Sequence, residues 1–217
     1  MMMLVVMFVL VFSLTFLAAP TLGSGWFWEL GNGLGFAAFA GLLYLVASGR
    51  LTRDVRIHRI MAQCVLLVVL AHVFWFLLGD AAVVEFMKPG APAYMWFGIA
   101  GMALLGALVL APPLPEGRRA TGGPGMVRRR HGLLAVAVIL AAAGHVVGSQ
   151  FYLRAPHQVL LFVLLAAAAC SGRVPMAGAG ADPGAASAAK PITIAAFYLG
   201  YCLLFAFLFS AIRNLMT

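Results

Sequence analysis

Long apolar runs constrain this chain more than any other feature of its sequence. A helix needs about 20 apolar residues to cross the roughly 30 Å hydrocarbon core of a bilayer. Runs of this kind cover residues 3–22, 34–48, 57–78, 93–110, 133–147, 158–170 and 192–212. The second and fifth extend to Leu30 and His131, and the sixth is short. We therefore predict an all-α, polytopic membrane helix bundle of seven helices, with six as the alternative.

Composition supports a membrane location. Of the 217 residues, 64% are hydrophobic and 9% are charged, whereas an ordinary soluble domain has about 25% charged residues. A soluble globular domain is therefore excluded. The first run is also compatible with a signal peptide, because small residues at 18, 19 and 23 lie at a suitable cleavage distance. No Lys or Arg precedes that run, so we expect an uncleaved helix.

Positive charge is concentrated on one side of the predicted membrane. The chain has 14 Lys and Arg against 6 Asp and Glu, a net charge of +8. Eleven of the 14 lie in three loops on the same side, namely Arg50, Arg53, Arg56, Arg59, Arg118, Arg119, Arg128, Arg129, Arg130, Arg173 and Lys190. Loops rich in Lys and Arg face the cytoplasm. The charge is thus a topology signal that contacts membrane lipid, and we expect no nucleic-acid partner.

The chain is predicted to be one integral membrane domain spanning residues 1–217, with its histidine-bearing core at residues 30–172. Residues 173–190 are rich in Gly, Ala and Pro, which predicts a flexible cytoplasmic loop. Residues 191–217 form an extra C-terminal helix. Arg outnumbers Lys and Ala and Gly are abundant, which indicates a bacterial source and hence the bacterial inner (plasma) membrane.

Four of the five histidines form two pairs of equal separation. His58 and His72 are 14 residues apart, and so are His131 and His145. Fourteen helical residues turn through about 1400°, which is about 40° short of four full turns, and rise about 21 Å. Both rings of a pair therefore lie on nearly the same helix face, one near each end of the bilayer.

Topology aligns the two pairs. The third and fifth helices run in the same direction because two crossings separate them, so His58 and His131 share the cytoplasmic level. His72 and His145 share the outer level. Two imidazoles at each level predict two haems between the third and fifth helices, each iron having two histidine ligands. Small residues that are expected to leave room for the macrocycles, or else to serve ordinary helix packing, are Ala71, Gly132, Gly144 and Gly148.

Other metals and other roles for histidine fit less well. A zinc site needs its ligands within a few ångströms of one another, and the two histidine levels are far apart. For any single histidine the alternative is a hydrogen bond to a neighbouring helix. His157 follows Arg154 and Pro156 in an outer loop, and we expect it to have no ligand role.

This pattern resembles the ferric reductase-like transmembrane domain, the membrane module of ferric reductases, NADPH oxidases and the haem-binding subunit of the periplasmic methionine sulfoxide reductase system. The resemblance rests on RIHRIMAQCVLLVVLAH, which holds His58 and His72, and on RRRHGLLAVAVILAAAGH, which holds His131 and His145. It covers roughly residues 30–172. It implies that two b-type haems, with these histidines as axial ligands, carry electrons from a cytoplasmic donor to an acceptor at the outer face.

The chain also departs from that family. Ferric reductases and NADPH oxidases usually append a flavin and nicotinamide domain, whereas this sequence ends in a membrane helix. We therefore expect an oxidoreductase component that receives electrons from a separate flavoprotein, carrying FAD or FMN, or from a quinol. The acceptor is expected to be a periplasmic protein or ferric iron. The helix at 192–212 lies outside the usual six.

Two other functions stay open. A quinol-oxidising cytochrome b subunit of a larger complex uses a similar set of histidine pairs. It would need an outer carboxylate such as Glu29, Asp80 or Glu85 to take the quinol proton, although each is more often a solvated loop residue. The other is a non-catalytic membrane assembly or sensor subunit, in which haem is structural or absent.

Overall fold

The computed structural model describes residues 2–16, 25–48, 55–110, 124–171 and 191–215. These residues form helices and contain no strand, which confirms the predicted all-α class. The helices are α1 (Met2–Phe16), α2 (Trp26–Ser48), α3 (Val55–Gly79), the 3-10 helix η1 (Ala81–Met87), α4 (Ala93–Leu110), α5 (Pro124–Ser149), α6 (Pro156–Ser171) and α7 (Pro191–Leu215).

Five helices are long and apolar enough to cross a membrane. These spans are Trp26–Ser48, Val55–Gly79, Ala93–Leu110, Arg129–Ser149 and Ile192–Leu215. The helices α1 and α6 are apolar but shorter. Length and composition therefore agree with an integral membrane helix bundle.

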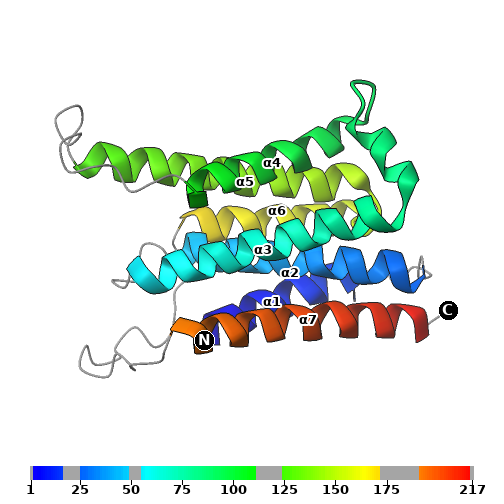
Figure 1. Cartoon of the computed structure of the whole chain (residues 1–217), viewed down its shortest axis with the longest axis horizontal. Helices are drawn as coiled ribbons and strands as arrows, with labels where there is room; N and C mark the ends of the chain where they lie inside the picture. The colour runs from blue at the N-terminus through cyan, green and yellow to red at the C-terminus, as the bar shows by residue number, and fades with distance from the viewer. Residues whose placement is uncertain (1, 17–24, 49–54, 111–123, 172–190, 216–217) are drawn as a thin grey trace.

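Successive α-helices run in opposite directions (Figure 1). The two histidine pairs each lie on one continuous helix, His58 and His72 on α3 and His131 and His145 on α5. These two helices run in the same direction, as predicted from the order of the spans. His58 and His131 are therefore near the beginning of their helices, while His72 and His145 are near the other end of the bundle.

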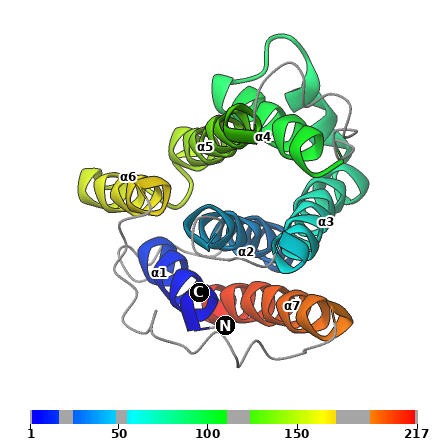
Figure 2. The same ribbon diagram turned by 90° about the vertical axis from the view of Figure 1, so that its left-hand side faces the viewer.

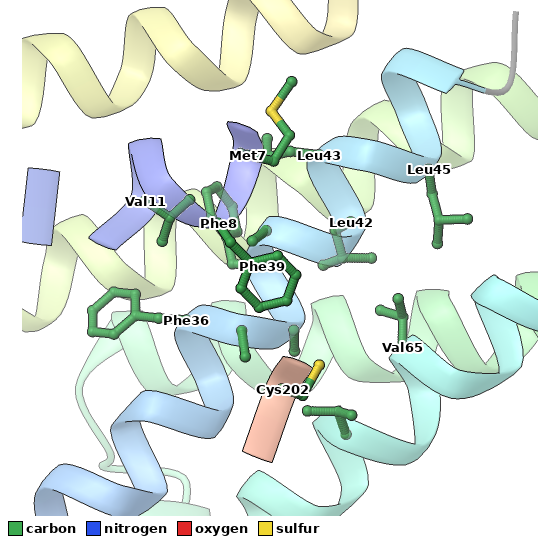
Figure 3. Packing of buried hydrophobic residues seen from close by; sticks show 14 of the residues in the cluster. Met7, Phe8, Val11, Phe36, Phe39, Leu42, Leu43, Leu45, Val65 and Cys202 are labelled. Atoms are coloured by element: carbon green, nitrogen blue, oxygen red, sulfur yellow. The ribbon is translucent and has the colours of Figure 1, made fainter. Parts of the chain in front are cut away.

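The helix α2 lies at the centre of the bundle. Viewed along the helices, it has α1 and α7 on one side and the arc of α3, α4 and α5 on the other (Figure 2). In the 18-residue apolar stretch of α2, 72% of the residues are buried inside the bundle. The corresponding share is 33% or less in the other four spans. Apolar side chains on α1, α2, α3 and α7 form the packed core beside it (Figure 3).

The C-terminal helix α7 is part of this core. A Cβ atom on Gly33 would lie 2.8 Å from the Cα atom of Ala206, and one on Gly41 would overlap the hydroxyl of Tyr198. Glycines at these positions let α2 and α7 approach closely, as small residues do between membrane helices. Residues 191–215 thus pack closely against the central helix α2.

Basic residues of the described segments are distributed unevenly between the two ends. Arg56, Arg59, Arg129 and Arg130 are exposed near the beginnings of α3 and α5. Lys88, Arg154 and Arg213 lie at the opposite end. The other predicted loop charges, at 50, 53, 118, 119, 173 and 190, and the predicted loop 173–190 lie outside the described residues.

Candidate ligand-binding site between two helix hairpins

A cavity of about 530 Å³ lies among α2, α3, α4 and α5. Small-molecule sites have volumes of about 300–1,000 Å³ and mostly apolar walls with a few polar groups. This cavity fits that description, because aliphatic and aromatic side chains form most of its wall. His72 and His145 both line it. The structure thus brings together the two histidines that were predicted to share the outer level.

Backbone carbonyl groups of the preceding helices hold both imidazoles. Nδ1 of His72 lies 2.7 Å from the carbonyl oxygen of Gly31 on α2. Nδ1 of His145 lies 2.8 Å from the carbonyl oxygen of Tyr94 on α4. A carbonyl oxygen only accepts, so each Nδ1 carries the hydrogen. In neutral imidazole this leaves the lone pair on Nε2, which is how metal-binding histidines are commonly oriented.

A glycine faces each ring one helical turn beyond its carbonyl partner. A Cβ atom on Gly35 would lie 2.9 Å from Cε1 of His72. On α4, a Cβ atom on Gly98 would lie 2.8 Å from Nδ1 of His145. Real Cβ atoms do not come this close, so any larger residue would displace the imidazole. Gly35 and Gly98 were not predicted from the sequence as supports of the histidines.

The cavity wall consists of two matching halves. Six of the seven lining positions on α2 recur 63 residues later on α4, and four of the five on α3 recur 73 residues later on α5. The matched positions are Asn32 and Met95, Gly35 and Gly98, Phe36 and Ile99, Ala38 and Gly101, Phe39 and Met102, Leu42 and Leu105, Val69 and Ala142, His72 and His145, Val73 and Val146, and Phe76 and Ser149. The hairpins α2–α3 and α4–α5 therefore face the cavity as two copies of one unit.

The arrangement of the four helices agrees with this repeat. Around the cavity, α2 lies opposite α4 and α3 lies opposite α5 (Figure 2). Each helix therefore faces its counterpart across the space. A ligand in the cavity would therefore contact matched positions of the two hairpins on its two opposite faces. One imidazole would lie on each side of it.

The other two histidines meet at the opposite end of α3 and α5. The ring centres of His58 and His131 are 6.2 Å apart. Nδ1 of His58 is buried and has no hydrogen-bond partner among the described residues. His131 is exposed. These rings thus form a second histidine pair, at the opposite end of α3 and α5 from His72 and His145.

No group of three or more His, Cys, Asp or Glu side chains in the described segments could hold a metal ion. A metal at either histidine pair would need further ligands besides these two imidazoles. His157, on the first turn of α6, is exposed and does not line the cavity.

Two of the small residues expected to make room for a macrocycle serve helix packing instead. A Cβ atom on Gly144 would lie 3.3 Å from Cδ2 of Phe97, and one on Gly148 would lie 2.7 Å from Cβ of Tyr94. Both glycines thus allow α4 to pack closely against α5, which agrees with the alternative of ordinary helix packing. A Cβ atom on Gly132 would meet nothing within 4 Å.

Glu29 differs from its predicted environment. We expected a solvated loop residue, but α2 begins at Trp26 and the Glu29 side chain is fully buried. Its Oε2 atom lies 2.9 Å from Nε of Arg213 on α7 and accepts a hydrogen bond of 3.0 Å from the hydroxyl of Tyr152. Tyr152 lies between α5 and α6 and lines the cavity. Glu29 is thus part of a buried polar cluster.

The other two candidate carboxylates have local structural roles. Asp80 caps η1, because its Oδ1 atom accepts a hydrogen bond of 2.9 Å from the backbone nitrogen of Ala82. Glu85 forms an exposed ion pair of 2.7 Å with Lys88. Neither side chain lines the cavity.

Comparison of the chain with protein-family models, curated proteins and solved structures gave no match. The resemblance stated above therefore depends on the four histidines, their spacing and their surroundings.

Proposed function

We propose that the chain is a transmembrane electron carrier that binds two b-type haems, each through two histidines, in the manner of ferric reductase-like membrane domains. One observation carries the proposal. His72 and His145, from two helices that run in the same direction, line one cavity, and a backbone carbonyl holds each Nδ1. That hydrogen bond is the usual outer-shell partner of a metal-binding histidine.

The outer site fits haem in shape as well as in donor chemistry. A planar tetrapyrrole with its metal between two imidazoles presents similar surfaces on both faces. The matched halves of the cavity wall offer such a ligand equivalent positions on both sides. Gly35 and Gly98 leave the imidazoles space against their supporting helices. Two ligands, rather than three or more, suffice for haem iron because the macrocycle supplies the rest.

The inner pair fits by its spacing. Metal–imidazole bonds are about 2 Å long, so two imidazoles that would hold the same metal ion must lie within a few ångströms of each other. The rings of His58 and His131 are 6.2 Å apart. The buried Nδ1 atom of His58 lacks a hydrogen-bond partner among the described residues, so this imidazole is not held in the way that His72 is.

Haem bound at these sites would supply reversible one-electron chemistry. His72 and His145 would hold it between the two hairpins, and the mostly apolar wall would limit its contact with water. With two histidines at each site, the iron would have little access to oxygen or substrate as further ligands. The chain then acts as a conductor, and chemistry takes place on its partners.

We infer the direction of transfer from the charges at the ends of the bundle. Exposed Arg56, Arg59, Arg129 and Arg130 lie at the end that holds His58 and His131. By the positive-inside rule this end faces the cytoplasm of a bacterium. A flavoprotein with FAD or FMN, or a quinol, would reduce the chain there. A periplasmic protein or ferric iron would be the acceptor at the outer end.

A quinol-oxidising cytochrome subunit is the second candidate. It is favoured by Glu29, a buried carboxylate that Tyr152 connects to the cavity wall. Reduction by a quinol analogue alone would support this candidate. A requirement for a flavoprotein and NAD(P)H would support the first.

The haem content of the purified full-length chain tests the proposal. We expect about two haems per chain and a low-spin b-type spectrum with a split or broadened band. The spectrum follows from two environments, one buried in the cavity and one nearer the exposed end. A folded protein that purifies without haem, from cells that supply it, would contradict the proposal and favour an assembly or sensor subunit.

Replacing Gly98 by alanine is expected to weaken the outer haem site. The new Cβ atom would lie 2.8 Å from Nδ1 of His145, so the ring must move off the Tyr94 carbonyl. Overpacking of this kind costs about 1–3 kcal/mol, which is about 5-fold to 150-fold in affinity. Haem retention during dilution measures the effect.

Gly106→Ala on the same helix is the matched control, because a Cβ atom there meets nothing within 4 Å. It should retain haem like the unmodified chain. Equal haem loss in the two variants would show that any Gly-to-Ala substitution on α4 weakens haem binding. Displacement of His145 would then not be the cause.

A further inference from the structure

A buried chain of polar groups leads from the ion pair on α2 and α7 to the cavity. The side chains of Glu29 and Arg213 are 0% and 3% exposed. The Tyr152 hydroxyl donates to Glu29, and Nδ2 of Asn32 lies 2.8 Å from the Tyr152 oxygen. The Arg213 guanidinium also lies over the Tyr152 ring, 4.7 Å from its centre. Both Tyr152 and Asn32 line the cavity.

The direction of these hydrogen bonds fixes the orientation of Asn32. Glu29 is an ion-paired carboxylate and can only accept, so the Tyr152 hydroxyl hydrogen is donated to it. The Tyr152 oxygen must then accept from Asn32, which assigns Nδ2 to the atom that faces it. One hydrogen of the Asn32 amide is used, and its second hydrogen remains for another acceptor.

The imidazole and Ser149 donors of the cavity wall are already engaged. Nδ1 of His72 and Nδ1 of His145 donate to backbone carbonyls. The Ser149 hydroxyl donates to the carbonyl oxygen of Val146. The second amide hydrogen of Asn32 is therefore available to a ligand, while the first is donated to Tyr152 and holds the side chain in place.

This polar group breaks the repeat between the two halves of the site. The α4 position that matches Asn32 is Met95, and the position 63 residues after Glu29 is Pro92. The histidine scaffold therefore does not require a polar side chain here. Asn32 marks one edge of a cavity whose wall is mostly apolar.

We propose that Asn32 donates a hydrogen bond to a carboxylate on the edge of the cavity ligand, and that Tyr152, held by Glu29 and Arg213, positions Asn32 to do so. This inference rests on the proposed function, because tetrapyrroles of the haem b type carry two propionate groups. A carboxylate accepts hydrogen bonds only, which matches the remaining amide hydrogen. The helix α7 thereby contributes to ligand recognition through Arg213 without lining the cavity.

The test compares two ligands that differ only in their carboxyl groups. Iron protoporphyrin IX and its dimethyl ester are titrated into the haem-depleted full-length chain carrying His58→Ala, so that absorbance reports the outer site. A hydrogen bond to a charged group predicts that the free acid binds about tenfold or more tightly than the ester. Asn32→Leu should abolish this preference, and Met95→Leu, at the matching position, should keep it.

Tyr152→Phe separates positioning from folding. It removes the oxygen that holds the Asn32 amide but keeps the aromatic ring under Arg213. A positioning role predicts a reduced preference for the acid with the ester affinity unchanged. Equal weakening of both ligands would show that Tyr152 only supports the fold and would overturn its part in the proposal.

The outcomes separate this inference from the proposed function. An acid preference that survives in Asn32→Leu, or that is absent from the parent chain, overturns the role of Asn32 while haem binding stands. If neither porphyrin binds, or if binding is unaffected by His72→Ala, the outer haem site itself is wrong. Asn32→Leu can be assessed beside Tyr152→Phe, because each removes one end of the same hydrogen bond.

Discussion

Replacing His72 or His145 by alanine is expected to reduce the haem content from about two per chain to about one. Either change leaves the outer iron with one imidazole and removes the group that the Gly31 or Tyr94 carbonyl holds. Haem extracted from the purified variants and quantified against protein measures the loss. The remaining haem should keep a low-spin b-type spectrum.

The inner site should survive both changes. His58 lies about 21 Å from His72 along α3, because 14 helical residues separate them. Substitutions this far apart without shared partners act nearly independently. The converse variants, His58→Ala and His131→Ala, should spare the outer haem and remove the other spectral component.

His157→Ala provides the matched control for these four variants. His157 is exposed on α6 and does not line the cavity, so its removal should leave both haems in place. Retention of two haems by both His72→Ala and His145→Ala would contradict the assignment of the outer ligands. Loss of both haems in every variant, with loss of the fold, would instead show that the sites are not independent.

The relative positions of the paired histidines on α3 and α5 were predictable from sequence, because they depend on local helix geometry. A separation of 14 residues within one helix fixes the relative face and height of two side chains whatever surrounds them. His72 and His145 therefore meet in one cavity as the pattern suggested. The supporting glycines were not predictable in this way, since Gly35 and Gly98 acquire their role only once neighbouring helices pair.

The repeat between the two hairpins was hidden for a related reason. The offset is 63 residues between α2 and α4 but 73 between α3 and α5, because the two hairpins have connections of different length. A comparison of the sequence with itself at one fixed shift cannot align both helices. Four of the matched pairs are identical, namely Gly35 and Gly98, Leu42 and Leu105, His72 and His145, and Val73 and Val146. These identities are spread over two different offsets, and other pairs such as Asn32 and Met95 differ in chemistry.

Glu29 illustrates the limit of local reasoning about charge. Its partner Arg213 is on the last helix, and Tyr152 is between α5 and α6. Sequence alone placed Glu29 before a membrane span, where carboxylates are usually solvated. Only the packing of α7 against α2 buries the residue and brings a guanidinium to it.

Breaking this ion pair is expected to produce the largest loss of stability among single substitutions at this end of the bundle. Arg213→Met leaves the buried Glu29 carboxylate without its cation, and Glu29→Gln leaves a buried guanidinium without its anion. Removal of one partner from a buried pair costs about 3–5 kcal/mol, because the remaining charge stays in a medium of low dielectric constant. Unfolding in mixed detergent micelles measures the change in the free energy of unfolding.

The double variant Glu29→Gln/Arg213→Met should recover most of that loss, since it leaves no uncompensated charge in the bundle. Lys88→Met is the matched control: it breaks an ion pair of 2.7 Å whose side chains are 62% and 65% exposed, and exposed pairs contribute little. A double variant as unstable as the two single losses combined would mean that Glu29 and Arg213 act separately. The helix α7 would then be held by its apolar packing alone, and the path from Arg213 through Glu29 and Tyr152 to Asn32 would not be a coupled unit.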